Sequence, residues 1–280
     1  MTTSATEPLA AGTHTVEIDG VVQRYHVHGT GPVCVAHSGG PGIVWEYLRM
    51  PALERHLTIV YPEPIGTGAS GHLPSHPHGY TRPRYSRFLG ALVEHLGVPE
   101  VFLLGHSHGG FVAQYHALHH PERIAGVILY ESAPLTGPEH GAEAMRLVQS
   151  FAALHADHPE LPEVLAAFQA IPTISGDAQM TAVARGLLPA YFADYWRRTS
   201  PRTSSTTVRD LGSLTVPTLV VVGRHDVICG VRWAEELHLL IPGSELLVLE
   251  NSGHFGHLEE PEAFSQAVTR FVTAVNSPGS

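Results

Sequence analysis

Cysteine is scarce in this chain of 280 residues, which contains only Cys34 and Cys229. Two cysteines cannot form a framework of disulfides, so the fold must depend on a hydrophobic core. The length is sufficient for one large core, either as one domain or as one domain with an insertion. Cys34 stands in an apolar run and is expected to belong to this core, whereas Cys229 follows Asp226 in a loop.

Positive charge and long apolar runs are lacking as well. The chain has 16 Lys and Arg against 26 Asp and Glu, which gives a net charge of −10 with neutral histidines, and it has no basic cluster. This balance argues against nucleic acid and against an anionic membrane surface as partners. No apolar run approaches the ~20 residues of a membrane-spanning helix. The first twelve residues contain no Lys, no Arg and no apolar run, so we expect no secretory signal and a cytoplasmic location.

Histidine, in contrast, is abundant, with 21 residues. Pairs such as His26 with His28 and His76 with His78 invite the interpretation of a metal site, but they lack spaced carboxylate or cysteine partners. We expect these side chains to be solvated or hydrogen-bonded, and we expect neither a metal ion nor another cofactor. The sequence leaves the oligomeric state open.

Eight short segments predict a mostly parallel sheet. The first two are joined at Asp19-Gly20, a dipeptide that is typical of a tight hairpin turn. Most of the others are continuous apolar runs, which suit strands that are buried on both faces of a parallel sheet. The expected strands comprise residues 13–18, 21–27, 33–36, 57–61, 101–104, 126–130, 218–222 and 245–249.

Helical patterns alternate with these strands and predict an α/β fold. They cover residues 45–56, 84–96, 110–119, 232–240 and 260–275. Residues 134–214 contain no convincing strand, but they contain three further helical patterns, at 141–155, 162–170 and 178–196. We therefore expect a core domain of residues 1–133 and 215–280 with an inserted helical cap, or lid, of residues 134–214.

The segment Gly105-His106-Ser107-His108-Gly109 carries the most specific functional signal. It has the pattern G-x-S-x-G, and it stands between the expected strand 101–104 and the expected helix 110–119. An abrupt turn from a strand into a helix exposes the central serine, and small neighbours leave room for the crowded backbone. Ser107 is therefore the candidate nucleophile.

A serine becomes a good nucleophile only when a base takes its proton and an acid orients that base. On this type of turn the partners follow in the order serine, acid, histidine. Asp226 and His254 each follow an expected strand, at the edge where the sites of open α/β sheets form. They are our candidates, with Glu131 as a rival acid and His257 as a rival base.

Backbone N–H groups must also stabilise the negative oxygen that forms during acyl transfer. One donor is expected at His108, directly after the serine and at the start of a helix. The second is expected in the loop His37-Ser38-Gly39-Gly40-Pro41-Gly42, where glycines let the backbone turn its N–H inward. We choose Gly40, with Gly39 as the alternative.

These motifs resemble those of the α/β-hydrolase superfamily, and more narrowly those of its proline iminopeptidase-like branch. The branch motif H-G-G-P-G has its counterpart in Ser38-Gly39-Gly40-Pro41-Gly42. The segment His254-Phe255-Gly256-His257-Leu258-Glu259-Glu260-Pro261 is similar to the histidine segment of such enzymes. The resemblance covers the chain from about Val21 to Val275 outside the cap. It implies an α/β-hydrolase fold, with the catalytic roles on Ser107, Asp226 and His254.

The chain departs from the branch in three places. Glu63-Pro64-Ile65-Gly66-Thr67-Gly68-Ala69-Ser70 stands where the branch has D-Q-R-G-x-G-x-S, so that Ile65 replaces the arginine. His106 and His108 replace the glycine and the tryptophan that flank the serine in G-G-S-W-G. The cap carboxylates show no spacing that identifies a site for a substrate's free amine; they are Glu160, Glu163, Asp177 and Asp194.

The sequence therefore predicts a serine hydrolase that forms an acyl-enzyme on a small ester, lactone or amide. The alternatives are an aminopeptidase that acts on an N-terminal proline, an enzyme that cleaves carbon–carbon bonds or forms peracids, and a non-catalytic binding protein. The expected partner is a small molecule or a short peptide. Phe192 and Trp196 in the cap are the expected substrate-binding side chains.

Overall fold

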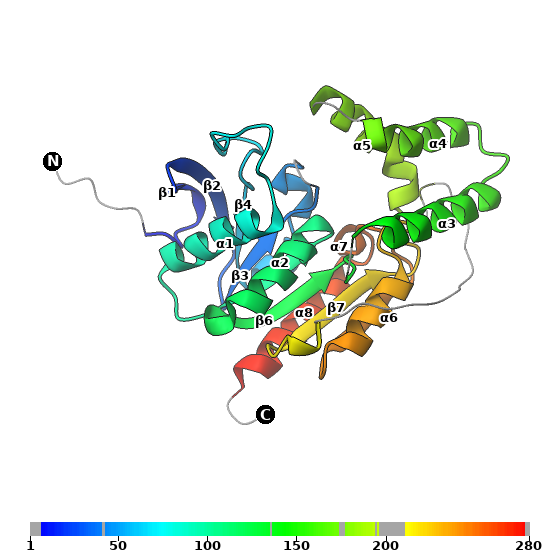
Figure 1. The fold of residues 1–280 in the computed structure, drawn as a ribbon. Helices are drawn as coiled ribbons and strands as arrows, with labels where there is room; N and C mark the ends of the chain where they lie inside the picture. Colours follow the sequence, from blue (N-terminus) through cyan, green and yellow to red (C-terminus); the bar gives the residue numbers. More distant parts are fainter. Residues whose placement is uncertain are drawn as a thin grey trace.

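Eight strands form one sheet in the computed structural model, which describes residues 7–40, 43–134, 136–173, 177–193, 195 and 211–277. The strands are β1 (Gly12–Ile18), β2 (Val21–His28), β3 (Val33–His37), β4 (Thr58–Pro62), β5 (Val101–His106), β6 (Ile124–Tyr130), β7 (Thr218–Gly223) and β8 (Glu245–Leu249). Their order in space is β1-β2-β4-β3-β5-β6-β7-β8 (Figure 1). β2 pairs antiparallel with β1 and with β4, whereas all other neighbours are parallel. The predicted mostly parallel sheet of eight strands is confirmed.

Side chains along the parallel strands alternate between two hydrophobic layers. In β5, Leu103 packs into the layer that is covered by α1 (Arg82–Leu96), α2 (His108–His119) and α6 (Val231–Leu240). Its neighbours Phe102 and Leu104 pack on the opposite face, which α8 (Pro261–Asn276) covers. Burial on both faces explains why these strands are continuous apolar runs. The carboxyl ends of the parallel strands meet at one edge of the sheet, where the loops that follow them come together.

The predicted helix at residues 45–56 is wrong. The structure has two short 3₁₀ helices instead, η1 (Trp45–Leu48) and η2 (Leu53–Arg55). Pro51 lies between them, has no N–H to donate, and disfavours helical backbone at the residue before it. The buried side chains of Trp45 and Leu48 fix η1 against the sheet.

Three helices lie between β6 and β7, namely α3 (Pro138–Leu154), α4 (Leu161–Ala170) and α5 (Asp177–Tyr191). No strand interrupts them in the described part of this segment. Figure 1 shows them together beyond the carboxyl ends of β6 and β7. They share a hydrophobic cluster around Phe151 and Phe168. α5 ends at Tyr191, and not at residue 196 as predicted. The remaining short elements are η3 (Pro121–Arg123), η4 (Ile171–Thr173), η5 (Leu211–Ser213) and α7 (Gly256–Glu259).

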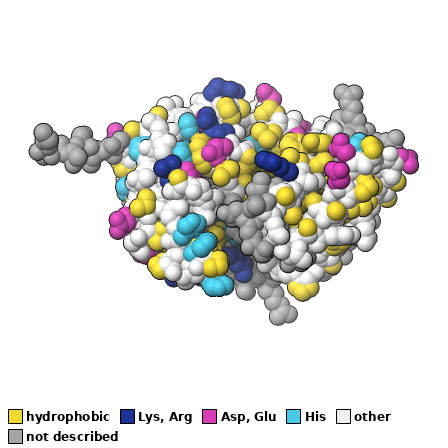
Figure 2. Space-filling view, turned by 90° about the horizontal axis from the view of Figure 1, so that it is seen from above, with side chains coloured by type: hydrophobic (Ala, Val, Ile, Leu, Met, Phe, Trp, Pro, Cys, Tyr) yellow, Lys and Arg dark blue, Asp and Glu magenta, His cyan; other side chains and the backbone are white. Residues whose placement is uncertain are grey.

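Large apolar side chains reach the surface over this helical segment. The described residues include eight exposed large hydrophobic side chains, and four of these belong to the helical segment: Met145, Ile171, Leu188 and Tyr195. Figure 2 shows apolar side chains spread over the right half of the molecule and most of the visible histidines over the left half. None of the helices within the described residues is both long enough and apolar enough to span a membrane.

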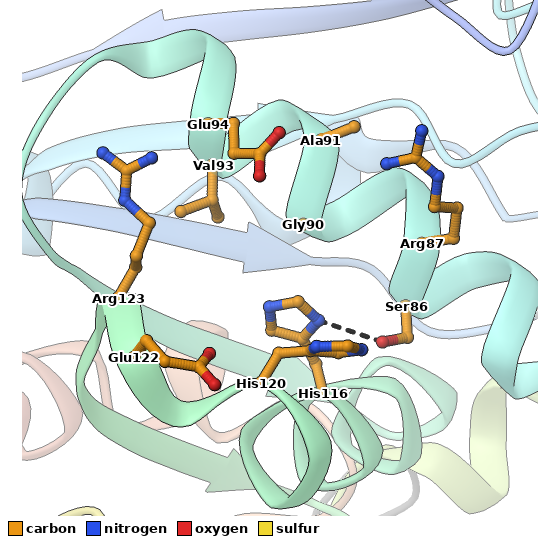
Figure 3. A pocket seen from close by; sticks show the side chains of 10 residues that line it. All are labelled: Ser86, Arg87, Gly90, Ala91, Val93, Glu94, His116, His120, Glu122 and Arg123. Carbon is orange, nitrogen blue, oxygen red and sulfur yellow. Dashed lines mark hydrogen bonds between the residues drawn. The ribbon is translucent and has the colours of Figure 1, made fainter.

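Helices α1 and α2 pack closely at Gly90. A Cβ atom on Gly90 would lie 2.9 Å from Cε1 of His116, so a larger residue would push the two helices apart. Ser86 Oγ and His116 Nδ1 are 2.9 Å apart across the same contact (Figure 3). The hollow beside it is lined by residues of α1, α2 and η3, and it contains none of the candidate site residues.

Several histidines belong to the hydrogen-bonded interior of the fold. His37, His106, His116 and His257 are buried, and each has a hydrogen bond at a ring nitrogen. Burial disfavours the charged ring and lowers the pKa of all four, to about 4 for His116 and His257. These rings are therefore neutral at pH 7.

We expect acid to destabilise the fold in a defined pH range. The buried histidines have lower pKa values in the folded chain than in the unfolded chain, so unfolding takes up protons between about pH 6.5 and 4. The free energy of unfolding should fall as the pH is lowered through this range, by up to about 1.4 kcal/mol per histidine per pH unit.

Urea titrations at several pH values measure this dependence. His116→Gln should make it less steep, whereas the same change at the exposed His78 should leave it unaltered. A free energy of unfolding that stays constant between about pH 6.5 and 4 would contradict the expectation.

The buried sheet should also be sensitive to cavities. Leu104→Ala removes a side chain that is 0% exposed, and we expect it to lower the free energy of unfolding by about 2–5 kcal/mol. Leu239 is 83% exposed, and Leu239→Ala should change the same free energy by no more than about 0.5 kcal/mol. Denaturant titrations compare the two variants, and equal losses would contradict the assignment of the core.

Candidate active site

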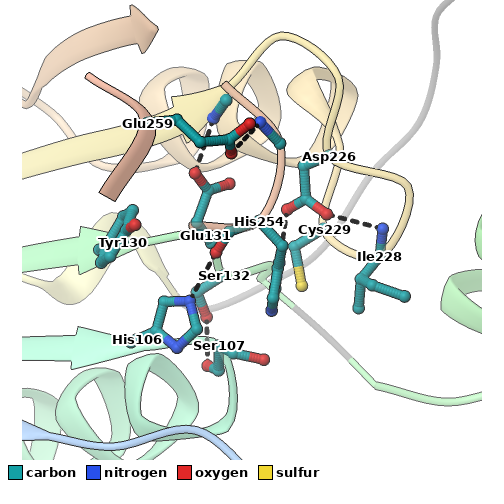
Figure 4. Close-up of polar contacts among 12 residues, drawn as sticks. His106, Ser107, Tyr130, Glu131, Ser132, Asp226, Ile228, Cys229, His254 and Glu259 are labelled. Atoms are coloured by element: carbon teal, nitrogen blue, oxygen red, sulfur yellow. Dashed lines mark hydrogen bonds and ion pairs between the residues drawn. The ribbon is translucent and has the colours of Figure 1, made fainter. Parts of the chain in front are cut away.

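Ser107 occupies the sharp turn between β5 and α2. Its φ is positive, at 52° with ψ at −117°, a conformation that is strained for any residue except glycine. The carbonyl oxygen of Tyr130 accepts its N–H at 2.9 Å, and Ser132 Oγ donates to its carbonyl oxygen at 3.1 Å. These two bonds hold the strained turn at the carboxyl end of β5 (Figure 4).

Two glycines make this turn possible. A Cβ atom on Gly105 would lie 2.3 Å from the carbonyl oxygen of Gly109, and one on Gly109 would lie 2.3 Å from that of His37. Both clashes are with backbone, which cannot move aside as a flexible side chain can. The G-x-S-x-G spacing therefore reflects the close approach of α2 to β5 and β3.

Asp226 and His254 lie together at the same edge of the sheet. Asp226 is in the turn after β7, and His254 is in the loop after β8. Asp226 Oδ2 and His254 Nδ1 are 2.9 Å apart, and both side chains are buried. Figure 4 shows the other edge of the His254 ring turned toward Ser107. Within the described residues no hydrogen bond joins Ser107 and this ring, a contact that often tightens only when substrate binds.

The Asp226 carboxylate keeps its charge in spite of its burial. Burial by itself favours the neutral acid, but the charge of His254 and hydrogen bonds from His254, Glu131 and Ile228 outweigh it. Together they lower the pKa of Asp226 to about 2. The Ile228 N–H donates to Asp226 Oδ1 at 2.7 Å, so both carboxylate oxygens have partners.

Glu131, the rival acid, lies beside Asp226 and contacts the backbone of Gly223. Its side chain is fully buried, and its Oε1 accepts the Gly223 N–H at 2.8 Å. Burial, the charge of Asp226 and a hydrogen bond to Asp226 raise the pKa of Glu131 well above its usual value. Glu131 therefore favours the neutral, protonated form beside the Asp226 carboxylate.

Among the described residues, Glu131, Asp226 and His254 are also the group whose ligand atoms could hold a metal ion, since these atoms lie within 4.8 Å of one another. In the structure these side chains are engaged with protein partners: Asp226 bonds to His254 and to the Ile228 N–H, and Glu131 Oε1 accepts the Gly223 N–H. An ion at this place would compete with these bonds.

His257, the rival base, is held away from Asp226. Its Nδ1 is 2.8 Å from Tyr130 Oη, and its Nε2 is 2.9 Å from the backbone oxygen of Tyr47. Both ring nitrogens are thus occupied by groups outside the Asp226–His254 pair. His257 supports the fold of this region.

The glycine loop after β3 lies against the serine. A Cβ atom on Gly39 would be 3.2 Å from Ser107 Cβ. The Gly39 N–H donates to Tyr47 Oη at 2.6 Å, so it already has a partner within the protein. Of the two alternatives this leaves Gly40, whose φ of 121° suits glycine, as the candidate donor. His108 begins α2 directly after Ser107.

The end of the helical segment is anchored to the histidine loop. The N–H of His254 donates to the carbonyl oxygen of Tyr191 at 2.6 Å. Glu259 accepts the N–H groups of Ala193 and Gly253, each at 2.7 Å. The segment from Tyr191 to Ala193 is therefore bonded on both sides to the loop that carries the candidate base.

Aromatic rings line this junction. Tyr191 lies 5.3 Å from the ring of His254, and Phe192 lies 5.2 Å from the ring of Phe255. Phe192 thus lies beside the residue that follows His254, and its role in substrate binding stays a prediction. Trp196 lies outside the described residues.

Of the four carboxylates that the sequence offered for binding an amine, the structure describes the side chains of two, and neither is buried. Glu160 and Glu163 are exposed at the start of α4. Asp194 and the side chain of Asp177 lie outside the described residues.

The turn after β4 carries Ile65 where the resembling branch has an arginine. Ile65 is buried, with an exposed fraction of 1%. Glu63 pairs with His26 at 2.8 Å and also accepts the Ala69 N–H. These contacts of Glu63 hold the turn.

Sequence reasoning missed Tyr47, His106 and Glu259, which bond to the glycine loop or to the histidine loop. The signal for Glu259 was available, since it stands in the histidine segment of the resemblance. His106 stood inside the serine motif, but nothing in the sequence indicated which atoms its ring would contact.

Comparison with known proteins is consistent with this arrangement. The Alpha/beta hydrolase family matches residues 18–267. The chain is 25% identical to a 2-hydroxy-6-oxo-2,4-heptadienoate hydrolase of Pseudomonas putida, covering 91% of this chain and 94% of that one. It is 27% identical to a pimeloyl-[acyl-carrier protein] methyl ester esterase of Vibrio vulnificus, covering 89% and 97%. It is 26% identical to a proline iminopeptidase of Saccharolobus solfataricus, covering 90% and 88%.

Solved structures give the same fold. The crystal structure of VinJ superposes with a TM-score of 0.70 at 26% identity, covering 94% of this chain and 99% of that one. A proline iminopeptidase of Mycobacterium smegmatis shares the fold with a TM-score of 0.66 at 20% identity, covering 94% and 98%. Because the family match extends from β1 into α8 and so includes every strand after β1, the chain belongs to the Alpha/beta hydrolase family.

Proposed function

We propose that the chain is a serine hydrolase in which Ser107 is the nucleophile, His254 the general base and Asp226 the acid that orients it. The observation that carries this proposal is the strained Ser107 turn beside a buried pair of Asp226 and His254, 2.9 Å apart. The relatives support the hydrolase class, because their names include an esterase, a peptidase and a carbon–carbon hydrolase.

Acylation follows from this geometry. His254 Nε2 takes the proton of Ser107 Oγ as that oxygen attacks the carbonyl carbon of the substrate. Asp226 holds Nδ1–H, which keeps the ring in the tautomer with a free Nε2 and stabilises the positive charge that the ring acquires. The protonated ring then gives its proton to the leaving group, and the acyl group remains on Ser107.

Deacylation reverses these roles with water as the nucleophile. His254 takes a proton from water, the hydroxide attacks the acyl carbon, and Ser107 Oγ leaves with the proton from the ring. In both steps the N–H groups of Gly40 and His108 donate to the negative oxygen of the tetrahedral intermediate. The positive end of the α2 dipole adds to this stabilisation.

The surroundings of the site support an uncharged substrate. In the described part of the chain, Tyr191, Phe192 and Phe255 gather beside His254, and His108 is neutral because burial lowers its pKa to about 4. A buried substrate ammonium would require an unpaired carboxylate, since an unpaired buried charge is costly. The carboxyl of Glu259 is engaged by two backbone N–H groups, as described above. We therefore favour a small ester, lactone or amide, with residues 134–214 acting as a lid.

A substrate panel tests this preference. Short acyl esters and lactones should be hydrolysed with higher kcat/KM than a proline arylamide. Faster hydrolysis of the proline arylamide would make the chain an aminopeptidase.

A carbon–carbon hydrolase is the second candidate, because the relative from Pseudomonas putida, whose name indicates this chemistry, is covered almost completely. The two candidates differ in whether the substrate acylates the serine. Mass spectrometry of the enzyme quenched during turnover distinguishes them: a Ser107 adduct supports the ester hydrolase, and its absence during rapid turnover supports the second candidate.

Ser107→Ala should abolish turnover and leave the fold intact. The small side chain fits the turn, whereas loss of the nucleophile should lower kcat by about 10⁴-fold or more. Ser75→Ala, at an exposed loop serine, is the matched control and should be as active as the wild type. If the Ser107 variant kept a near-normal rate on the best ester, the acyl-enzyme mechanism would be excluded.

Asp226→Asn should lower kcat/KM far more than Glu131→Gln. The asparagine cannot stabilise the charged His254 ring, which should cost about 10⁴-fold. The glutamine still accepts the Gly223 N–H and places no second negative charge beside Asp226, so kcat/KM should fall by no more than about tenfold. Steady-state kinetics on one substrate compare the two, and the reverse ranking would assign the acid role to Glu131.

A further inference from the structure

A chain of hydrogen bonds passes behind Ser107 and joins two loops of the site. The Gly39 N–H donates to Tyr47 Oη at 2.6 Å, and Tyr47 Oη is 2.8 Å from His106 Nδ1. His106 Nε2 is 2.9 Å from the backbone oxygen of His254. The chain thus begins in the glycine loop after β3 and ends in the histidine loop after β8. The function proposed above uses neither Tyr47 nor His106.

The two ends of this chain fix the direction of every proton in it. The Gly39 N–H can only donate, and the His254 carbonyl oxygen can only accept. His106 Nε2 must therefore carry a proton, and in the neutral ring Nδ1 can then only accept, so that the Tyr47 hydroxyl donates to it. This arrangement requires a neutral ring, and burial together with the neighbouring His254 lowers the pKa of His106 well below its usual value.

Space is tight along the chain. A Cβ atom on Gly39 would lie 3.0 Å from Tyr47 Oη and 3.1 Å from His106 Nδ1. His106 itself is 2% exposed and directly precedes Ser107 in the sequence. Its ring lies 4.8 Å from the His254 ring and 5.4 Å from the Tyr47 ring. The bonds therefore act between parts that already have little freedom to move.

We propose that Tyr47 and His106 are positioning residues that lock the glycine loop and the histidine loop together on either side of Ser107. This inference rests on the serine hydrolase function proposed above. By holding the Gly39 N–H, Tyr47 sets the direction of the next peptide, which carries the Gly40 N–H. By holding the His254 carbonyl oxygen, His106 sets the position of the base.

Such a lock acts on the transition state more than on substrate binding. Oxyanion donors contribute only when they are already aimed at the oxygen that becomes negative. A displacement of about 1 Å in a catalytic group can cost about 100-fold in rate. Loss of the lock should therefore lower kcat and leave KM within about threefold of the wild type.

Tyr47→Phe removes one hydroxyl group and keeps the ring. We expect kcat on the best ester to fall about 10- to 100-fold with KM nearly unchanged. Tyr61→Phe is the matched control, because Tyr61 Oη accepts the Met50 N–H at 3.1 Å and donates to Glu54 at 2.9 Å, in the same pattern. It should lower Tm similarly and keep the wild-type kcat. Equal kcat in the two variants would overturn the proposal.

His106 is tested by a pair of substitutions. Glutamine can accept from Tyr47 and donate to the His254 carbonyl oxygen, whereas leucine can do neither. His106→Gln should retain kcat within about fivefold, and His106→Leu should lose about as much as Tyr47→Phe. If both variants fold and the kcat of His106→Gln is no higher than that of His106→Leu, the hydrogen bonds of His106 do not support kcat, and the proposal is overturned.

The double variant Tyr47→Phe/His106→Leu separates a lock from two independent effects. Residues that act as one unit give losses that are not additive. The kcat of the double variant should therefore lie within about threefold of the kcat of the slower single variant. Multiplied losses would overturn the proposal. Ser107→Ala, measured with the same ester, tests the underlying hydrolase function separately. Loss of the nucleophile should abolish turnover whether or not Tyr47 and His106 hold the two loops together.

Discussion

Backbone contact at the turn from β5 into α2 is the constraint on which the rest of the site depends. With any side chain larger than glycine at positions 105 and 109, the helix would be pushed away from the strand and from the backbone of His37. The contact forces Ser107 into its strained backbone conformation and places its side chain at the carboxyl edge of the sheet. Asp226 and His254 are then brought to the same edge by parallel strands, with no further special geometry.

Burial decides which groups at this edge carry charge. Two carboxyls lie close together, and their pKa values shift in opposite directions: the pKa of Asp226 is lowered to about 2, whereas that of Glu131 is raised well above its usual value. Two negative charges at neighbouring buried positions would repel each other. The negative charge of Asp226 faces the ring of His254 and stabilises the positive charge that this ring would acquire during the reaction.

The sequence predicted the parts of the molecule that obey local rules. Continuous apolar runs identified the buried strands, and the serine motif with its flanking strand and helix identified the turn. The helix expected at residues 45–56 was wrong because Pro51 outweighed the hydrophobic pattern there. The 3₁₀ helix η1 that forms there instead carries Tyr47, whose contacts with Gly39 and His106 no periodicity reveals.

Contacts between loops that are distant in the sequence could not be predicted, for a different reason. The partners of His106 are 59 and 148 residues away along the chain, and only the three-dimensional fold brings them beside its ring. The neutral state of Glu131 likewise depends on the burial that β7 and the loop after it create. The choice of Asp226 and His254 as candidates needed only strand ends, whereas these supporting groups needed the three-dimensional fold.

The bonds between Tyr191, Ala193 and the histidine loop couple the end of α5 to the candidate base. Any outward movement of this stretch would have to break the His254–Tyr191 bond and the contacts of Glu259. Such a movement would also displace the loop that holds His254. A substitution that loosens the stretch from Tyr191 to Ala193 should for this reason disturb proton transfer as well as packing.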